Sequence, residues 1–195
     1  MRDLSQRHLS RILVVLLLVG VVGASLGVAS NAIWTDSQDV DANVFSTGTV
    51  DISTNPITAL VTYSGMAPGD EVTNPITVTN AGSLELRYAV TSTTTEDTLA
   101  AQLDLTIKTG VTTCTNAGFD TDGSVIYGPG DLGSTTGTDV IGDPTQGAQA
   151  GDRTLATNEV LCFNVQLPSS TGDTFQGLTT TATFTFAAEQ TANNP

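Results

Sequence analysis

From Asn43 onward, the chain is dominated by Thr, Val, Ile and Ser in short runs that Gly, Pro, Asn and Asp interrupt. β-branched residues favour strands, and the interrupting residues are those of turns. Helical periodicity is nearly absent. The pattern predicts an all-β fold, an antiparallel two-sheet sandwich that is jelly-roll-like, with one short helix and a long Gly-rich loop. A closed β-barrel is the main alternative fold.

Several short runs have the composition or alternation of strands. The first changes phase near Gly48, where a bulge or a sharp bend is expected. The last is the clearest, because Ala182, Phe184 and Phe186 alternate with threonines and share one face. The runs are residues 43–53, 57–63, 71–79, 84–91, 103–108, 160–167 and 178–187.

Turn residues predict how two of these runs connect. Pro68 fixes φ and Gly69 supplies a positive φ, which together predict a type II turn within residues 66–70. The runs 71–79 and 84–91 flank a second turn and are expected to pair as an antiparallel hairpin.

One short helix is expected at Thr95–Gln102, because its first residue can cap it and Glu96 and Asp97 complement the helix dipole. Ten of the nineteen glycines lie between Gly110 and Gly151. This density predicts that residues 110–158 are a Gly/Thr/Asp-rich insertion rather than part of the core.

Residues 1–32 have the three parts of an export signal peptide. Three arginines precede an apolar run at residues 12–22, and small residues follow. Cleavage is expected after Ala32, which leaves residues 33–195 as a single β-sandwich domain, secreted or held at the cell surface. A permanent anchor is the alternative, because the apolar stretch approaches the roughly 17 residues that span a bilayer.

Cleavage would leave three basic residues against nineteen acidic ones, a net charge of −16. Nucleic acid and anionic lipid are poor partners for such a domain, because both are bound by clustered Lys and Arg. Contact with a membrane is expected only through the uncleaved signal. The acidic surface either keeps the domain soluble outside the cell or binds cations.

Histidine limits the chemistry that the domain can perform. The single histidine, His8, lies in the signal, so residues 33–195 have none. Zinc peptidases and serine or cysteine hydrolases depend on imidazole, so we expect no catalytic residues and no enzyme. Glu85, Glu96 and Glu159 are candidates for a glycosidase carboxylate pair, but few aromatic residues are present to stack sugars.

Cys114 and Cys162 are expected to form a disulfide in an oxidising compartment, with two free thiols as the alternative. Asp120 and Asp122, followed by a glycine, have the beginning of a calcium loop but lack its third acid and its terminal glutamate. A surface Asx turn explains them equally well. No cofactor is therefore expected, with calcium at these two aspartates as the open alternative.

Four motifs resemble TasA and camelysin proteins, and they occur in the order of that family. They are residues 33–51, Met66–Glu71, Asn80–Leu84 and Phe175–Phe186. The resemblance implies a jelly-roll-like sandwich that is exported through a dedicated signal peptidase. It also implies assembly into extracellular fibres of a biofilm matrix, with copies of the chain as partners.

In those fibres the N-terminal strand of one subunit completes the sheet of the next. The resemblance places Ile33, Trp34, Val44, Phe45 and Val50 in this assembly strand. Strand donation is physically reasonable, because backbone hydrogen bonds along an open edge supply affinity and alternate apolar side chains fill slots in the acceptor. The alternative is that this segment folds back on its own subunit.

Part of the same family carries a metallopeptidase label, and the lack of histidine speaks against transferring that activity. The first hypothesis is therefore a structural subunit of a surface or matrix fibre. The second is a monomeric surface-binding module or adhesin, whose loop at residues 110–151 meets a ligand. A metal-dependent protease is a distant third.

Overall fold

The computed structural model of the chain describes residues 9–18, 46–57 and 65–194. Two compact units are present, Met1–Phe45 and Ser46–Pro195. In the first unit, residues 9–18 are helical. No helix among the described residues is long and apolar enough to cross a membrane. The strand predicted at residues 57–63 lies outside the described residues except for Ile57.

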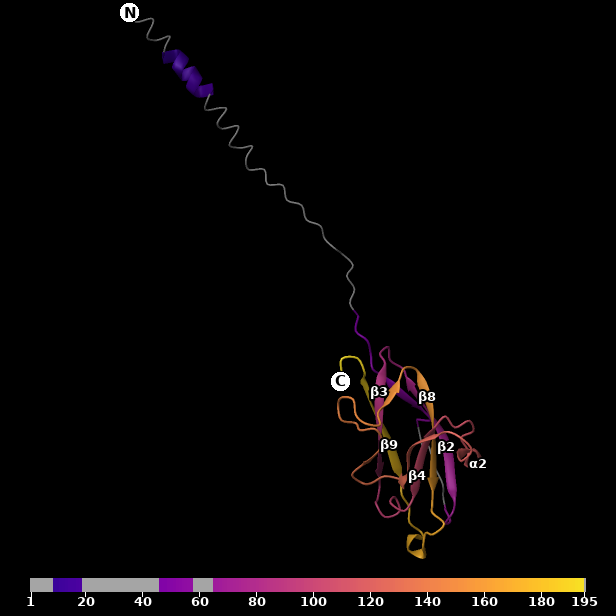
Figure 1. The fold of residues 1–195 in the computed structure, drawn as a ribbon. Coiled ribbons are helices and arrows are strands. Elements are labelled where there is room, and N and C mark those ends of the chain that lie inside the picture. Colours follow the sequence, from indigo (N-terminus) through magenta and orange to yellow (C-terminus); the bar gives the residue numbers. More distant parts are fainter. Residues whose placement is uncertain (1–8, 19–45, 58–64, 195) are drawn as a thin grey trace, which may run out of the picture. The chain divides into compact units, whose positions relative to one another are not determined.

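The second unit consists of two antiparallel sheets (Figure 1), so the predicted sandwich is confirmed. The order of the first sheet is β1 (Ile52–Asn55), β2 (Glu71–Asn80), β8 (Asn158–Gln166), β4 (Asp104–Thr109) and β5 (Ser124–Asp131). In the second sheet, β3 (Leu86–Thr94) pairs along its whole length with β9 (Ala182–Gln190). Its other edge is shared by β6 (Thr138–Ile141) and β7 (Arg153–Leu155).

The hydrophobic core lies between the two sheets and is closed by aromatic contacts. Phe163 of β8 and Phe184 of β9 meet edge to face, with ring centroids 5.0 Å apart. Tyr88 of β3 packs against Phe186 of β9 at 5.9 Å. Because each fully buried aliphatic or aromatic side chain contributes about 2 kcal/mol, these inward faces supply most of the stability. The most deeply buried apolar side chains are Val78, Leu86, Tyr88, Val90, Leu105, Ile107, Leu161 and Phe163.

The predicted hairpin between residues 71–79 and 84–91 is wrong, because β2 and β3 lie in different sheets. The chain between them crosses from one sheet to the other. Its backbone is held by an upstream segment: Ala81 N–H donates to Asp51 O, and Ser83 N–H donates to Thr49 O. Both strands turn an apolar face to one core, so periodicity alone does not show whether they pair.

The short helix is not where the sequence predicts it, since residues 95–97 have no regular structure and residues 98–102 form turns. The Glu96 carboxylate accepts hydrogen bonds from the N–H groups of residues 98–100 at 2.7 to 3.2 Å. Glu96 thus takes the capping role that the sequence predicts for Thr95. The short α-helix is α2, Asn116–Phe119, and the 3₁₀ turn η1 covers Asp173–Phe175.

The prediction that residues 110–158 lie outside the core is also wrong. This segment contains α2, β5, β6 and β7, and it buries Phe119, Leu132, Val140, Ile141 and Leu155. Its glycines lie largely in the turns between short strands. Gly128 is an exception within β5, where its φ is +86° and a Cβ would lie 2.1 Å from the carbonyl oxygen of Leu105.

The structure confirms the predicted turn at residues 66–70 and most of the predicted strands. Asp70 N–H donates to Ala67 O at 2.9 Å and φ of Gly69 is +98°, which confirms the turn with Pro68 and Gly69 at its centre. Strands β2, β3, β4, β8 and β9 occupy the runs predicted for them, with shifted ends. In the first run, residues 46–51 have no regular structure and only Ile52 and Ser53 belong to a strand.

Candidate functional site

Within the described residues, β9 is an edge strand, because β3 is its only partner there. Two hydrogen bonds at its ends show which way its backbone groups point: Thr95 N–H to Thr181 O at 3.0 Å, and Thr191 N–H to Glu85 O at 3.2 Å. In an antiparallel pair, alternate residues direct their N–H and C=O to opposite edges. Odd-numbered residues of β9 therefore face β3, and even-numbered residues face outward.

The outward N–H and C=O groups of β9 form the open edge, defined here as those of Ala182, Phe184, Phe186 and Ala188. These eight groups make no hydrogen bond to any other residue that the structure describes. The side chains of the same residues pack against the core but stay only partly buried. The open edge thus combines unpaired backbone groups with a row of incompletely covered apolar side chains.

The remaining edges of the two sheets are short or blocked. On β2, β1 covers only Thr77–Asn80, and the uncovered half carries Pro75, which has no N–H. There the carbonyl of Glu71 already accepts a hydrogen bond from the Asn116 side chain at 2.8 Å. On β5, Pro129 and two register shifts interrupt the edge. β6 and β7 have four and three residues, whereas β9 has nine and none of these protections.

The N-terminal segment joins the folded body at Thr49. Its carbonyl accepts hydrogen bonds from the N–H groups of Ser83 and Leu84 at 3.0 and 3.2 Å, and its N–H donates to Ser83 Oγ at 3.0 Å. Gly48 lies directly on Leu84, since a Cβ on this glycine would be 2.5 Å from the Leu84 side chain. The close approach requires glycine, which explains the break in alternation at this position.

This junction lies at the C-terminal end of the open edge. Leu84, which is bonded to Thr49, is followed by Glu85, whose carbonyl accepts the N–H of Thr191 just after β9. Thr49 is therefore held near the C-terminal end of β9.

Of the residues predicted for the assembly strand, Ile33, Trp34, Val44 and Phe45 lie outside the described residues. Val50 is 39% exposed and sits between two residues that bond to residues 81–84 of the same chain. The structure thus places Val50 in the folded body of its own domain.

A family model described as camelysin metallo-endopeptidase matches residues 9–194. The chain belongs to the camelysin family. The match covers nearly the whole chain and confirms the family resemblance of the sequence motifs. No curated protein matches the chain.

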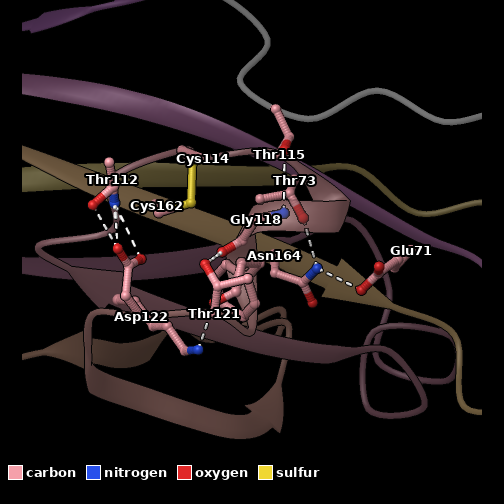
Figure 2. Close-up of a disulfide and its surroundings, with 12 residues drawn as sticks. Glu71, Thr73, Thr112, Cys114, Thr115, Gly118, Thr121, Asp122, Cys162 and Asn164 are labelled. Carbon is pink, nitrogen blue, oxygen red and sulfur yellow. Dashed lines mark hydrogen bonds between the residues drawn. A yellow bond between two sulfur atoms is a disulfide. The ribbon is translucent and has the colours of Figure 1, made fainter.

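In this camelysin-family domain, the predicted disulfide between Cys114 and Cys162 is present (Figure 2). The side chain of Cys162 points to the outer face of β8, because its neighbours Leu161 and Phe163 face the core. Cys162 is nevertheless buried. The disulfide attaches residues 112–122, including α2, to the outside of the first sheet. Below this segment a polar cluster is satisfied internally: the Asn164 amide donates to Thr73 Oγ1 at 2.7 Å and to Glu71 Oε2 at 2.9 Å (Figure 2).

Asp120 and Asp122 lie in the same segment but have different surroundings. Asp122 accepts hydrogen bonds from the hydroxyl and the N–H of Thr112, at 2.5 and 3.1 Å, and these bonds lower its pKa (Figure 2). The Asp120 side chain is 89% exposed and lies 3.8 Å from Lys108 Nζ. Within the described residues, no three His, Cys, Asp or Glu side chains are grouped to hold a metal ion.

Glu159 joins the two sheets of the camelysin-family domain. Its carboxylate accepts the Tyr88 hydroxyl at 2.7 Å and the Nε and Nη2 of Arg153 at 2.9 and 2.5 Å. Burial, followed by the bond to Glu159, raises the pKa of Tyr88 well above its usual range. The same carboxylate raises the pKa of Arg153. Glu85 and Glu96 bond elsewhere, to Thr191 and to a turn, so the three candidate glutamates have separate partners.

Residues 142–152 form a strap over the outer face of the second sheet. Arg87 Nε donates to Glu189 at 2.6 Å, its Nη2 donates to the carbonyl of Asn194, and Gly147 N–H donates to Glu189 at 3.1 Å. The Asp152 carboxylate accepts the N–H groups of two other strap residues. A cavity of about 130 Å³ lies between the strap and strands β3 and β9.

The open edge was not identified from the sequence. The alternation at residues 178–187 predicts the strand and its inward face, but edge status depends on which strands pair. The available signal was the lack of Pro, Lys or Arg within β9, which distinguishes it from protected edges.

Proposed function

We propose that this domain is a structural subunit of an extracellular fibre, in which the N-terminal strand of one copy is accepted at the open edge of β9 in the next. The open edge is the observation that carries the proposal, because an unpaired strand is a template for pairing with another chain. Membership in the camelysin family supports a location outside the cell or at its surface. Export through residues 1–32 is part of the same proposal.

The sequence upstream of Gly48 has the pattern that such an edge requires. Val40, Ala42 and Val44 alternate with Asp39, Asp41 and Asn43. In an added strand, this period of two would turn the apolar side chains toward the core and the carboxylates toward solvent.

Backbone hydrogen bonds and side-chain burial would contribute differently to the affinity of the joint. Eight backbone hydrogen bonds worth about 1 kcal/mol each would contribute on the order of 8 kcal/mol. Association and strand ordering together cost a comparable amount. Burial of the apolar side chains along the edge must therefore supply much of the net affinity.

Charge also favours β9 as the place where copies meet. Residues 182–188 carry no charge, and Glu189 is paired with Arg87. The other basic residues after residue 32, Lys108 and Arg153, contact carboxylates as well. An uncharged strand is therefore the part of this acidic domain that another acidic copy can approach at least electrostatic cost.

A proline scan of β9 tests the proposal on purified residues 33–195. Ala188→Pro removes an outward N–H and leaves the bonds to β3 in place, so we expect a folded domain that forms no fibres. Ala187→Pro removes an N–H that faces β3, so it should lower the melting temperature instead. Negative-stain microscopy and thermal melts separate the two effects. Fibres of Ala188→Pro like those of the unmodified domain would contradict the proposal.

Two further outcomes would redirect the assignment. If the unmodified domain stays monomeric across salt, pH and concentration, a monomeric surface-binding module becomes the better hypothesis. We also propose that the domain is not an enzyme, and casein hydrolysis that a chelator abolishes would contradict this.

A further inference from the structure

Residues 111–122 form a flap that the disulfide fastens to the outer face of the first sheet (Figure 2). The flap connects β4 to β5, and these strands pair up to Thr109 and Ser124, next to it in the sequence. A glycine with positive φ stands at each end of the flap, with +72° at Gly110 and +84° at Gly123. Glycine adopts such angles without steric cost, so these two positions can serve as hinges.

The flap is closed on itself by its own hydrogen bonds. At its base, Asp122 accepts the N–H and the hydroxyl of Thr112 at 3.1 and 2.5 Å (Figure 2). Within it, Thr115 caps α2 by accepting the N–H of Gly118 at 3.3 Å. These bonds do not involve the sheet beneath. The flap can therefore move as one unit about its two hinges.

The noncovalent contacts of the flap with the sheet lie outside the hydrophobic core. Asn116 Nδ2 donates to the carbonyl of Glu71 at 2.8 Å. Lys108 Nζ donates to the carbonyl of Phe119 at 2.7 Å and lies 4.4 Å from the centroid of its ring. Because Ile107 faces the core, its neighbour Lys108 points to the outer face of β4. Lifting the flap would thus leave the core between the two sheets closed.

The two sulfur atoms of the disulfide differ in access. Cys162 is 1% exposed and is fixed in β8, which pairs with β2 on one side and with β4 on the other. Cys114 belongs to the flap and is only half-buried. Thiol–disulfide exchange requires that the attacking thiolate reach the sulfur with which it forms a bond. The accessible sulfur is therefore that of Cys114.

We propose that Cys114 is a site of thiol–disulfide exchange with a small thiol, and that this exchange releases the flap while both sheets stay folded. The thiolate attacks Cys114 Sγ and forms a mixed disulfide. The bond to Cys162 breaks, and Cys162 Sγ keeps the electron pair and takes a proton from water. When the flap returns, the Cys162 thiolate attacks Cys114 Sγ and expels the small thiol, so the latch is reversible. The proposal does not depend on fibre formation.

The exchange changes the surface that the domain presents. In the closed form Phe119 is 4% exposed, although it lies outside the core. The open form exposes its ring and uncovers the thiol of Cys162. An oxidising environment favours the closed form, and an excess of small thiols favours the open one.

Glutathione is the probe for the site of attack. The purified chain is treated briefly with millimolar glutathione, free thiols are trapped with N-ethylmaleimide, and both groups are located by peptide mass spectrometry. We expect glutathione on Cys114 and N-ethylmaleimide on Cys162 as the main product. A main product with the two groups exchanged would overturn Cys114 as the site. A chain that stays unmodified would overturn the latch.

Chymotrypsin measures the opening, because the buried Phe119 becomes a cleavage site when the flap leaves the sheet. Cleavage follows the population of the open form when opening and closing are fast. We expect reduction to cause cleavage after Phe119 while the far-UV circular dichroism of the uncut chain stays unchanged. No new cleavage there would overturn the proposal. Cleavage after the core residue Phe163 together with loss of the circular dichroism signal would also overturn it, because the whole domain would then have unfolded.

Lys108→Gln separates the disulfide from the other contacts of the flap. With the disulfide intact, we expect this variant to resist cleavage after Phe119 as the unmodified chain does. After reduction it should be cut there about tenfold faster than the reduced unmodified chain, because a hydrogen bond from a charged donor is lost. Thr185→Ala, an exposed change on the other sheet, is the control and should be cut at the unmodified rate. If Lys108→Gln is cut equally fast before and after reduction, the disulfide is not the latch and the proposal is wrong.

Discussion

Phe163 and Phe184 meet edge to face across the core, with ring centroids 5.0 Å apart. The contact joins the centre of the first sheet to the edge strand of the second. Phe184 therefore has two roles: its ring holds β9 against the opposite sheet, while its backbone belongs to the open edge. The inward side chains thus hold β9 in place although, in the part of the chain that the structure describes, no strand pairs with its outer edge.

Replacing Phe184 by alanine should destabilise the domain by about 3 kcal/mol, at the low end for buried Phe→Ala changes because the ring is only partly buried. Urea unfolding followed by circular dichroism measures the change. Thr185→Ala, on the exposed face of the same strand, is the matched control and should shift stability by less than about 0.5 kcal/mol. Equal effects of the two variants would show that β9 is not anchored through its inward face.

Removing the disulfide should cost about 4 kcal/mol, because Cys114 and Cys162 are 48 residues apart and the bond restricts a long loop in the unfolded chain. The double variant Cys114→Ala/Cys162→Ala and the reduced unmodified domain should therefore unfold at similar, lower urea concentrations. The double variant should no longer respond to reductant. An unfolding midpoint that reductant leaves unchanged would show that the cross-link does not stabilise the domain.

Glu159→Gln should destabilise the domain by about 2 kcal/mol, because it leaves Arg153 without its carboxylate. The value lies below the range for fully buried pairs, since the Arg153 side chain is 25% exposed. Tyr88→Phe removes only the hydroxyl bond to Glu159 and should cost about 1.5 kcal/mol. The double variant Tyr88→Phe/Glu159→Gln tests whether the three groups act as a network. If its loss in free energy of unfolding equals the sum of the two single losses, they do not.

Some of these features were predictable because they depend on local chemistry. The Pro68–Gly69 turn follows from the φ values that each residue favours. The Thr/Phe alternation of residues 182–186 specified a strand and its inward face. The disulfide followed from two cysteines in a chain that the sequence predicts to enter an oxidising compartment.

The errors concern connections between distant segments. The turn after Asn80 had the residues of a hairpin, but Ser83 and Leu84 bond to Thr49, more than thirty residues upstream, and β3 enters the other sheet. Whether β9 is an edge strand also depends on which distant segments pair with each other. Glycine density at residues 110–151 predicted a loop, because several tight turns between short strands have the composition of one long insertion.

Acid should weaken the contact between Glu189 and Arg87. Hydrogen bonds, first from Arg87 and then from Asn194, lower the pKa of Glu189 in the folded domain. Its contribution to stability is therefore complete above the unfolded-state pKa of about 4.3 and is lost as the pH falls through the lower folded value. The stability difference between the unmodified domain and Glu189→Gln should shrink below about pH 4. The difference for Thr185→Ala should stay constant with pH, and a Glu189→Gln difference that grows in acid would contradict the assignment.

Fibre assembly should accelerate with salt, because both sides of the proposed joint belong to an acidic chain. Residues 33–195 carry a net charge of −16, and the donor segment contributes Asp39 and Asp41. Raising the salt from about 0.01 to about 1 M shortens the screening length from about 30 to about 3 Å, so repulsion between copies largely disappears. Light scattering at fixed protein concentration measures the rate. Asp39→Asn/Asp41→Asn should assemble faster at low salt and depend less on salt, while Ala188→Pro should not assemble at any salt. Fibres that dissolve as salt rises would mean that ionic attraction, rather than strand pairing at an uncharged edge, holds the copies together.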